Sequence, residues 1–257
     1  MNISLTFDVE EDLHSPTYLG LERGIPSLLK ILDKRRIKAT FFVPAKLIEK
    51  FPDYFKDLSK QGHEIALHGY EHERFDDLDY FEKEKRIKDS IKIYKKVFRT
   101  APKGFRAPQH SIDNQTLHIL KKNNFVYDSS YTPVNILQIL FFPKRLKHGF
   151  KGFFTQRNKY LLKNNLMEMP ISSSGIPFIS LPLRIFSGIF LRAYFYFLKI
   201  THKNLVFYAH SWDFIELPKS KIDRTFSYRK LLRNLDQLIS LSNKDKFILL
   251  EQLTKTK

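Results

Sequence analysis

The chain has 257 residues, of which 42% are hydrophobic and 14% aromatic, so it can bury a full core and is not a disordered chain. It contains no cysteine, which excludes disulfide scaffolds, thiolate metal sites and thiol nucleophiles and leaves histidine and carboxylate as metal ligands. A formal net charge of +17 at pH 7 indicates a polyanionic partner: nucleic acid, an anionic membrane or a phosphorylated substrate.

Short apolar runs alternate with helical patterns along the first half of the chain. We expect strands at residues 3–7, 38–43, 64–67, 104–106 and 125–127, and helices at 24–35, 51–61, 81–97 and 113–122. Strands separated by helices predict parallel βαβ units in a sheet or barrel. Residues 131–165 are less regular and are expected to form an insertion. Strands at 167–171 and 205–209 and helices at 183–199 and 228–241 complete a single domain over residues 1–257.

The start of the chain already alternates like a strand and lacks the basic and apolar regions of a secretory signal. The nearest candidate for a membrane span, residues 179–200, is interrupted by Arg184, Arg192 and Lys199. We therefore expect a cytoplasmic protein.

Four acids occur within residues 8–12, directly after the first expected strand. Asp8 and Glu10 are two residues apart, so they share a face if the strand continues. The carboxyl ends of parallel strands are where α/β proteins place their sites. On spacing alone, a solvated acidic turn explains the cluster equally well.

His68 and His72 follow the strand expected at 64–67. Four residues apart, they lie on one helical face and can share a metal. Together with a strand-end carboxylate they would form an open site of two histidines and one acid. His63 precedes the strand and is expected to make a structural hydrogen bond.

Three further strand ends carry polar side chains. Arg106 can hold a carboxylate through two parallel hydrogen bonds, and Pro108 fixes the direction in which the chain leaves the strand. An internal salt bridge is the alternative for Arg106. Residues 127–130 (YDSS) end the next strand, and His210 ends the last apolar strand, where a general acid or base would lie. A single histidine there is more often a core residue, but five polar strand ends favour a site.

These motifs, in this order, resemble those of the NodB-homology polysaccharide deacetylases, carbohydrate esterase family 4. They are TFDVE at 6–10, HGYEH at 68–72, FRAP at 105–108, YDSS at 127–130 and FYAHSW at 207–212. The DVE start, the FRAP and YDSS pair and the His-x-Trp ending are most similar to the exopolysaccharide-associated branch. The resemblance implies a distorted (β/α) barrel that removes acyl groups from N-acylated sugars with zinc or another divalent ion.

The resemblance also implies roles for the matching residues. Asp8 matches the catalytic base, Arg106 the arginine that holds this base, and His210 the general acid. Asp128 lies in a motif whose carboxylate orients that acid. Contacts with the substrate are expected from four residues: His14, Pro108, Gln109 and Trp212.

His68 and His72 match two metal ligands of the family. Many members have a second aspartate after the catalytic one, but this chain has Val9 there. Because a subset uses Asp-x-Asp, and because strand alternation puts it on the side of Asp8, Glu10 is the third ligand that we expect. Two other acids remain alternatives if the chain turns early: Glu11 and Asp12.

The expected reaction removes an acyl group, acetyl or alternatively formyl, from an amino sugar in a glycan or a lipid- or nucleotide-linked precursor. The first alternative is a glycosidase that uses Asp8 with Glu10 or Glu11 and needs no metal, which the histidine pair disfavours. The others are a basic nucleic-acid-binding protein, which no recognised motif supports, and a family member that binds sugar without turnover.

The positive charge is concentrated in residues 129–212, where eleven basic residues face one acid, Glu168, and so supply ten of the seventeen net charges. Aromatic runs at 141–142, 153–154 and 194–197 lie in the same region. This mixture suits peripheral contact with the anionic inner face of a membrane, although core aromatics and solvated lysines explain it equally well. We therefore expect a phosphate-bearing sugar carrier or its membrane as the polyanion, ahead of nucleic acid.

Overall fold

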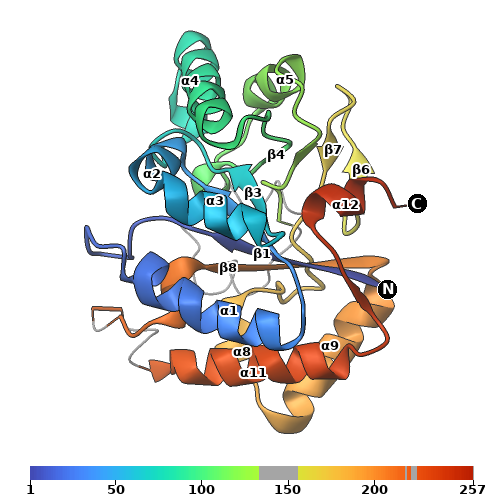
Figure 1. Ribbon diagram of the computed structural model, residues 1–257. Coiled ribbons are helices and arrows are strands. Elements are labelled where there is room, and N and C mark those ends of the chain that lie inside the picture. The colour runs from blue at the N-terminus through green and yellow to red at the C-terminus, as the bar shows by residue number, and fades with distance from the viewer. Residues whose placement is uncertain (133–155, 218, 221–224, 257) are drawn as a thin grey trace.

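The computed structural model describes residues 1–132, 156–217, 219–220 and 225–256 (Figure 1). Within them, a curled sheet has the strand order β6-β7-β5-β4-β3-β2-β1-β8, with β9 pairing to β1. These pairings are parallel except that of β6 with β7. The strands are β1 (Asn2–Asp8), β2 (Thr40–Val43), β3 (Glu64–Leu67), β4 (Gly104–Phe105), β5 (Tyr127–Asp128), β6 (Tyr160–Leu161), β7 (Met167–Glu168), β8 (Asn204–His210) and β9 (Lys246–Phe247).

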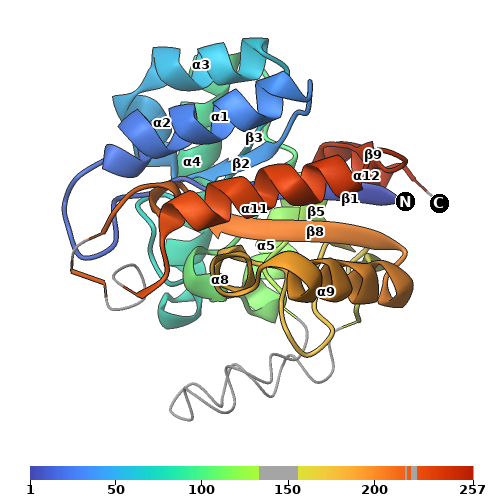
Figure 2. The same ribbon diagram turned by 90° about the horizontal axis from the view of Figure 1, so that it is seen from below.

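Helices pack around the outside of this sheet (Figures 1 and 2), which confirms the expected distorted (β/α) barrel. They are α1 (Ile25–Lys34), α2 (Ala45–Lys50), α3 (Pro52–Lys60), α4 (Tyr80–Phe98), α5 (Asn114–Lys122), α8 (Ser180–Ile185), α9 (Gly188–Thr201), α11 (Tyr228–Leu241) and α12 (Leu250–Thr254), with short turns η1 (Gly20–Gly24), η2 (Phe75–Asp77), η3 (Pro108–His110) and η5 (Ser211–Phe214). Strands β1, β2 and β3 are buried along almost their whole length, as expected for parallel strands covered on both faces. No helix in the described part of the chain is long and apolar enough to cross a bilayer.

Local sequence explains the main helices. In α1 the buried residues Ile25, Leu28 and Leu32 are three and four apart, so they form one stripe against the sheet. Helix α4 begins where the side chain of Asp79 accepts a hydrogen bond of 2.8 Å from the backbone N–H of Glu82. This capping satisfies an amide at the helix start that has no partner within the helix.

Several elements differ from the sequence prediction. The helix expected at 183–199 is two helices, α8 and α9, because Phe186 and Ser187 between them are extended. Among the α-helices and strands of the described residues, α2, β6, β9 and α12 were not predicted. Strands of two residues, such as β6 and β9, are too short to show a period. Of the insertion expected at 131–165, residues 133–155 lie outside the described residues.

The sheet register gathers several strand ends at one edge. Asp8, at the end of β1, pairs with His210 at the end of β8. The ends of β3 and β4 are also adjacent, so His68 and Arg106, which follow them, leave the sheet side by side. The predicted site residues of four strands therefore meet at the carboxyl edge.

Candidate active site

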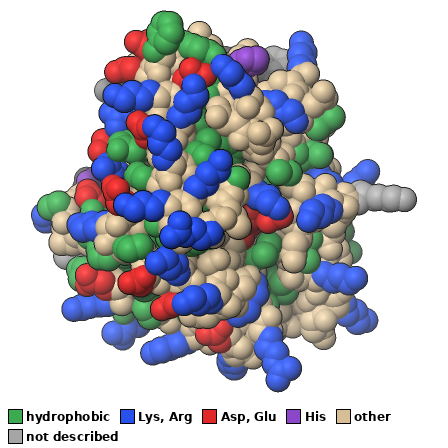
Figure 3. Space-filling view, turned by 45° about the horizontal axis from the view of Figure 1, so that its top comes forward, with side chains coloured by type: hydrophobic (Ala, Val, Ile, Leu, Met, Phe, Trp, Pro, Cys, Tyr) green, Lys and Arg blue, Asp and Glu red, His purple; other side chains and the backbone are tan. Residues whose placement is uncertain are grey.

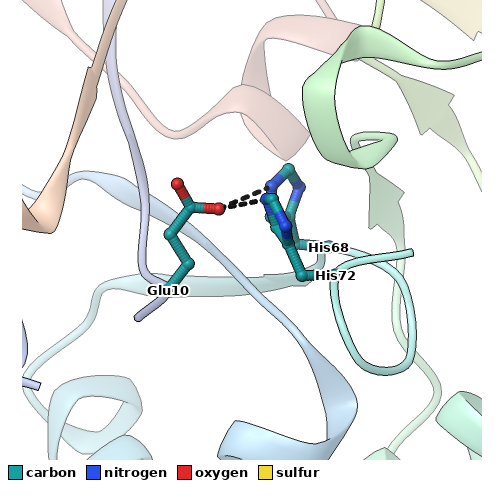
Figure 4. Close-up of side chains that lie close together, drawn as sticks. All are labelled: Glu10, His68 and His72. Carbon is teal, nitrogen blue, oxygen red and sulfur yellow. Dashed lines mark ion pairs between the residues drawn. The ribbon is translucent and has the colours of Figure 1, made fainter. Parts of the chain in front are cut away.

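Glu10, His68 and His72 form a group at the carboxyl edge, here called the ligand cluster (Figure 4). One ligand atom of each residue lies within 4.8 Å of the others. The Oε2 atom of Glu10 lies 3.8 Å from Nε2 of His68 and also contacts Nε2 of His72. Figure 4 shows both imidazoles on the same side of the carboxylate. The structure thus brings together the three ligands that the sequence predicted.

The donor atoms of the ligand cluster fit a divalent metal ion. Nδ1 of His68 lies 2.9 Å from the backbone oxygen of Arg106, and because a carbonyl only accepts, Nδ1 carries the proton and Nε2 keeps its lone pair. The Oε2 atom of Glu10 is buried and points at both imidazoles. Burial disfavours ionisation of Glu10, but the contact with His72 and the nearby histidine charges outweigh it and lower its pKa to about 2. Two imidazole nitrogens and an ionised carboxylate are ligands that suit zinc.

The local backbone explains why Glu10, and not a neighbouring acid, joins the cluster. The strand pattern continues past β1, since the N–H of Val9 donates to the β2 backbone at 2.9 Å. The Val9 side chain is fully buried, so Glu10 lies on the side of Asp8. Glu11 instead accepts a hydrogen bond from a tyrosine hydroxyl, and Asp12 accepts backbone N–H groups at the start of η1.

A buried ion pair fixes Asp8 beside the ligand cluster. Nη1 of Arg106 donates to Oδ1 of Asp8 at 2.8 Å, and both side chains are almost fully buried. Other guanidinium N–H groups donate to Thr6 and Ser129, so Arg106 makes one hydrogen bond to the carboxylate and not the parallel pair that we expected. Oδ2 of Asp8 lies 3.5 Å from Nε2 of His68. Burial disfavours the charge of Asp8, but His68 and then Arg106 outweigh it and hold its pKa below the ordinary value.

His210 lies beside the other oxygen of Glu10, with Nε2 3.6 Å from Oε1. Its ring stacks on Trp212, with centres 4.1 Å and planes 14° apart, and the indole N–H donates to the same Oε1 at 3.2 Å. Burial lowers the pKa of His210, but Asp213 and Glu10 outweigh it and raise the pKa above the ordinary value. The ring is therefore fixed in place and favours the protonated form that a general acid needs.

The carboxylate that contacts His210 is Asp213, whereas the structure places Asp128, the acid expected to orient His210, in other contacts. Oδ2 of Asp213 lies 3.4 Å from Nδ1 of His210 and accepts its backbone N–H at 2.8 Å. The buried Arg184 of α8 lies 3.2 Å from the other oxygen. The three-residue spacing from His210 to Asp213 was visible in the sequence, but no sequence signal indicates Arg184.

Asp128 instead supports the turn after β4. Its carboxylate accepts hydrogen bonds from the hydroxyl and N–H of Ser130, and that hydroxyl accepts the N–H of Ala107. Asp128 is also paired with Glu168 across β5 and β7. Burial raises the pKa of both acids, and that of Glu168 strongly, because the two carboxyl groups are buried side by side.

A cavity of about 750 Å³ opens at the ligand cluster. His14 and Trp212, two of the predicted substrate contacts, form part of its wall. Pro108 and Gln109 are not in the wall: Pro108 is buried, and the Gln109 side chain accepts a hydrogen bond from Arg74. The wall is made by Glu10, Glu11, Asp12, Leu13, His14, Tyr18, Pro44, Lys46, Leu47, Glu49, Lys50, Glu71, His72 and Trp212.

His63 has the structural hydrogen bond that was predicted for it. Its Nδ1 accepts the backbone N–H of Ala39 at 3.1 Å. Burial, assisted by Lys38, lowers its pKa to about 4, so the ring is neutral in the folded protein.

The first half of the chain matches a known sequence family, described as polysaccharide deacetylase, over residues 2–127. A peptidoglycan deacetylase-like protein of Gibberella zeae is 39% identical over 109 residues, or 42% of this chain and 32% of that protein. A peptidoglycan deacetylase of Helicobacter pylori is 35% identical over 123 residues, or 48% of this chain and 42% of that protein. The chain thus spans less than half the length of these relatives. The family match includes the ligand cluster, Asp8 and Arg106 but ends before His210.

Solved structures extend the similarity of fold to the whole chain. An allantoinase superposes with a TM-score of 0.70 at 15% identity, covering 99% of this chain and 89% of that one. A peptidoglycan N-acetylglucosamine deacetylase superposes with a TM-score of 0.60 at 20% identity, covering 100% of this chain and 89% of that one. At these identities the likeness concerns the fold alone, so the reaction has to be argued from the side chains of the site.

Proposed function

We propose that this protein is a metal-dependent hydrolase that removes an N-acyl group from an amino sugar, with acetyl as the preferred candidate. The premise is that residues 2–127 belong to the polysaccharide deacetylase family. That family consists of hydrolases acting on carbon–nitrogen bonds other than peptide bonds. One observation carries the proposal: the ligand cluster, the ionised Asp8 and the protonatable His210 meet at one edge of the sheet. Enzymatic amide hydrolysis of this kind uses a Lewis acid, a general base and a general acid, and these groups could supply all three.

Asp8 is the residue that we assign as the general base. A divalent ion held by Glu10, His68 and His72 would supply a Lewis acid able to polarise the acyl carbonyl and to make water more acidic. The Arg106 guanidinium, which donates to Oδ1 at 2.8 Å, keeps Asp8 ionised in spite of its burial. Because Arg106 occupies Oδ1, the oxygen that faces the cluster and takes the proton of the attacking water is Oδ2.

His210 is assigned as the general acid that protonates the departing amine. Its Nε2 faces the ligand cluster and also lies 2.6 Å from the Tyr208 hydroxyl, which can accept from it. Stacking on Trp212 fixes the plane of the ring, and Asp213 stabilises the imidazolium. A positioned acid or base of this kind contributes on the order of 10²–10⁴ in rate.

The charges of the cavity wall support an uncharged sugar as the bound part of the substrate. The wall holds five acids against two basic residues, Lys46 and Lys50. Such a wall attracts the ammonium group that deacylation produces and repels phosphate. For a lipid- or nucleotide-linked substrate, we propose that the phosphate lies outside this cavity. Membership of the exopolysaccharide-associated branch stays a prediction from the motifs.

The carboxylates argue against a glycosidase. Such an enzyme needs one carboxylic acid that is protonated near neutral pH. The pKa values of Asp8 and Glu10 are both lowered, and that of Glu10 is about 2, which argues against either as this acid. Glu11, the other candidate, is turned to the Tyr18 hydroxyl, from which it accepts a hydrogen bond. A nucleic-acid-binding protein would also not require an acid-rich cavity beside paired histidines.

The experiment is an acetate-release assay on N-acetylated chito-oligosaccharides and peptidoglycan glycan fragments. We expect release with the purified protein, loss of release after EDTA treatment, and recovery with zinc. Asp8→Asn is the inactive control. Cleavage of glycosidic bonds that is insensitive to EDTA, or no deacylation by the metal-loaded protein, would overturn the proposal.

Mass spectrometry of lipid-linked and nucleotide-linked sugars, with and without the gene, identifies the acyl group and the carrier. A product lighter by an acetyl group supports deacetylation, and one lighter by a formyl group supports deformylation. The same residues serve both reactions because only the acyl substituent differs.

A further inference from the structure

Helix α9 lies beside β8 at the outside of the molecule (Figure 2), and it carries exposed apolar side chains. Six of the ten exposed large hydrophobic side chains among the described residues lie in α9 or at the end of α8. Ile189 is 75% exposed, Phe190 71% and Tyr196 67%. The outer apolar face is formed by Ile189, Phe190, Tyr196, Phe197 and Ile200, with Ile185 beside it.

The opposite face of α9 is also apolar, and it packs on the core. Leu191, Phe195 and Leu198 are buried there, and Phe195 lies against Phe178, with ring centres 5.9 Å apart. A helix that is apolar on both faces is typical of a helix buried between two partners. The sheet is one partner of α9, and its outer face is fitted for a second.

The charges around this face indicate the nature of that partner. Residues 169–212 contain no aspartate or glutamate. Arg192 is exposed three residues after Ile189, and Lys203 is exposed just beyond the helix. Arg157 is also exposed, and the neighbouring Asn158 accepts the backbone N–H of Lys203 at 2.7 Å. On the face in Figure 3, in contrast, acidic and basic side chains are intermixed.

We propose that the outer face of α9 binds the surface of an anionic lipid bilayer, with the helix lying in the plane of the interface. Exposed aromatic and aliphatic side chains then enter the boundary of headgroups and acyl chains, and the basic residues contact anionic headgroups. A second copy of the chain fits this face less well. A two-fold interface would bring Arg192 of both copies into an apolar surface without an acid.

The connection from α9 to β8 fixes which end of the molecule approaches the bilayer. Helix α9 leads directly into β8, so its start lies at the end of the sheet where β8 finishes with His210. The ion pair of Arg184, in α8, with Asp213 confirms this placement. Ile189 and Phe190 are therefore at the same end of the sheet as the candidate site.

The test is co-sedimentation with phosphatidylcholine vesicles and with vesicles of phosphatidylcholine and phosphatidylglycerol. We expect binding to the anionic vesicles that weakens with salt. Phe190→Gln and Phe197→Gln should each lower the partition coefficient on the order of tenfold. Phe81→Gln is the matched control, because Phe81 is exposed on α4, far along the chain from this face, and its loss should leave binding unchanged.

A second pair of variants tests the electrostatic part. Arg192→Glu should lower binding to anionic vesicles on the order of tenfold, whereas Lys95→Glu, on the exposed side of α4, should not. Unchanged circular dichroism would show that the variants are folded. Because the experiment uses no substrate, a negative result would leave the proposed reaction unaffected. Equal binding to both vesicle types overturns the proposal. Absence of binding also overturns it, and a dimer that Phe190→Gln dissociates would assign the face to a second copy.

Discussion

Replacing Asp213 with asparagine tests the acid half of the site, because it removes one charge with little change of shape. The carboxylate lies 3.4 Å from Nδ1 of His210 and 3.2 Å from Arg184. At an effective dielectric constant of about 20, unit charges 3.4 Å apart attract by about 5 kcal/mol, which equals more than three pKa units as an upper bound. Burial, which lowers the pKa of His210, is unchanged in the variant, so loss of the Asp213 charge should lower this pKa even though Glu10 still raises it.

The assay is the pH dependence of kcat/KM for the wild type and Asp213→Asn. His210 acts as an acid only when protonated, so activity falls as the pH rises through its pKa. Because the substitution lowers this pKa, the alkaline limb should move to lower pH. At neutral pH we expect kcat/KM to fall by about 10²-fold or more. An alkaline limb at the wild-type pH with undiminished kcat/KM would refute the role of Asp213.

A double variant separates the effect of Asp213 on the pKa of His210 from its contribution to the stability of the fold. Asp213→Asn alone removes the charge of the carboxylate beside the buried Arg184, which should cost folding free energy. Adding Arg184→Met removes both charges, and replacing a buried pair with apolar groups is often neutral. We expect urea denaturation to show recovered stability, while the pH profile remains that of the single variant. Recovery of activity together with stability would mean that Asp213 is only structural.

Three further predictions concern single residues. Asp8→Asn should lower kcat on the order of 10²-fold or more while keeping the metal, and full activity in this variant would remove Asp8 as the base. His68→Ala should lose the metal by elemental analysis, whereas His118→Ala, an exposed control on α5, should retain it. His63 has a folded pKa of about 4, below its unfolded value of 6.5, so the unfolded chain binds its proton first as the pH falls. The stability that the neutral ring contributes is complete above pH 6.5, and up to about 3 kcal/mol is lost as the pH falls towards 4. His63→Gln should flatten this dependence in urea denaturation, and an unchanged slope would contradict the prediction.

The sequence predicted those parts of the fold whose pattern is local. Strands β1, β2 and β3 are apolar runs of four to seven residues between helices, so their place in a parallel sheet could be inferred. β4, β5, β6 and β7 have two residues each, and their pairing depends on contacts distant in the chain. The break between α8 and α9 was missed, although Ser187 and Gly188 interrupt the apolar pattern at this point.

Site residues that directly follow a strand end could be predicted from the sequence. Contacts that other, distant elements contribute to the site could not. Alternation through Val9 is enough to place Glu10 beside Asp8. Asp128 also follows a strand, but its contacts are set by Glu168, forty residues later in the chain, which no local pattern reveals. Arg184 comes from a short helix, and only tertiary packing brings it to the acid.

Two buried carboxylate–arginine pairs explain how one site keeps a base and an acid at the same pH. Asp8 with Arg106 and Asp213 with Arg184 are chemically alike, and the pKa of each aspartate is lowered. They differ in what the second oxygen faces. Oδ2 of Asp8 faces the ligand cluster and remains open to a proton, whereas Oδ2 of Asp213 faces the His210 ring and raises its pKa. Because Asp8 and His210 are paired on neighbouring strands, about 5 Å apart in the sheet, a substrate at the ligand cluster meets an ionised base and a protonated acid together.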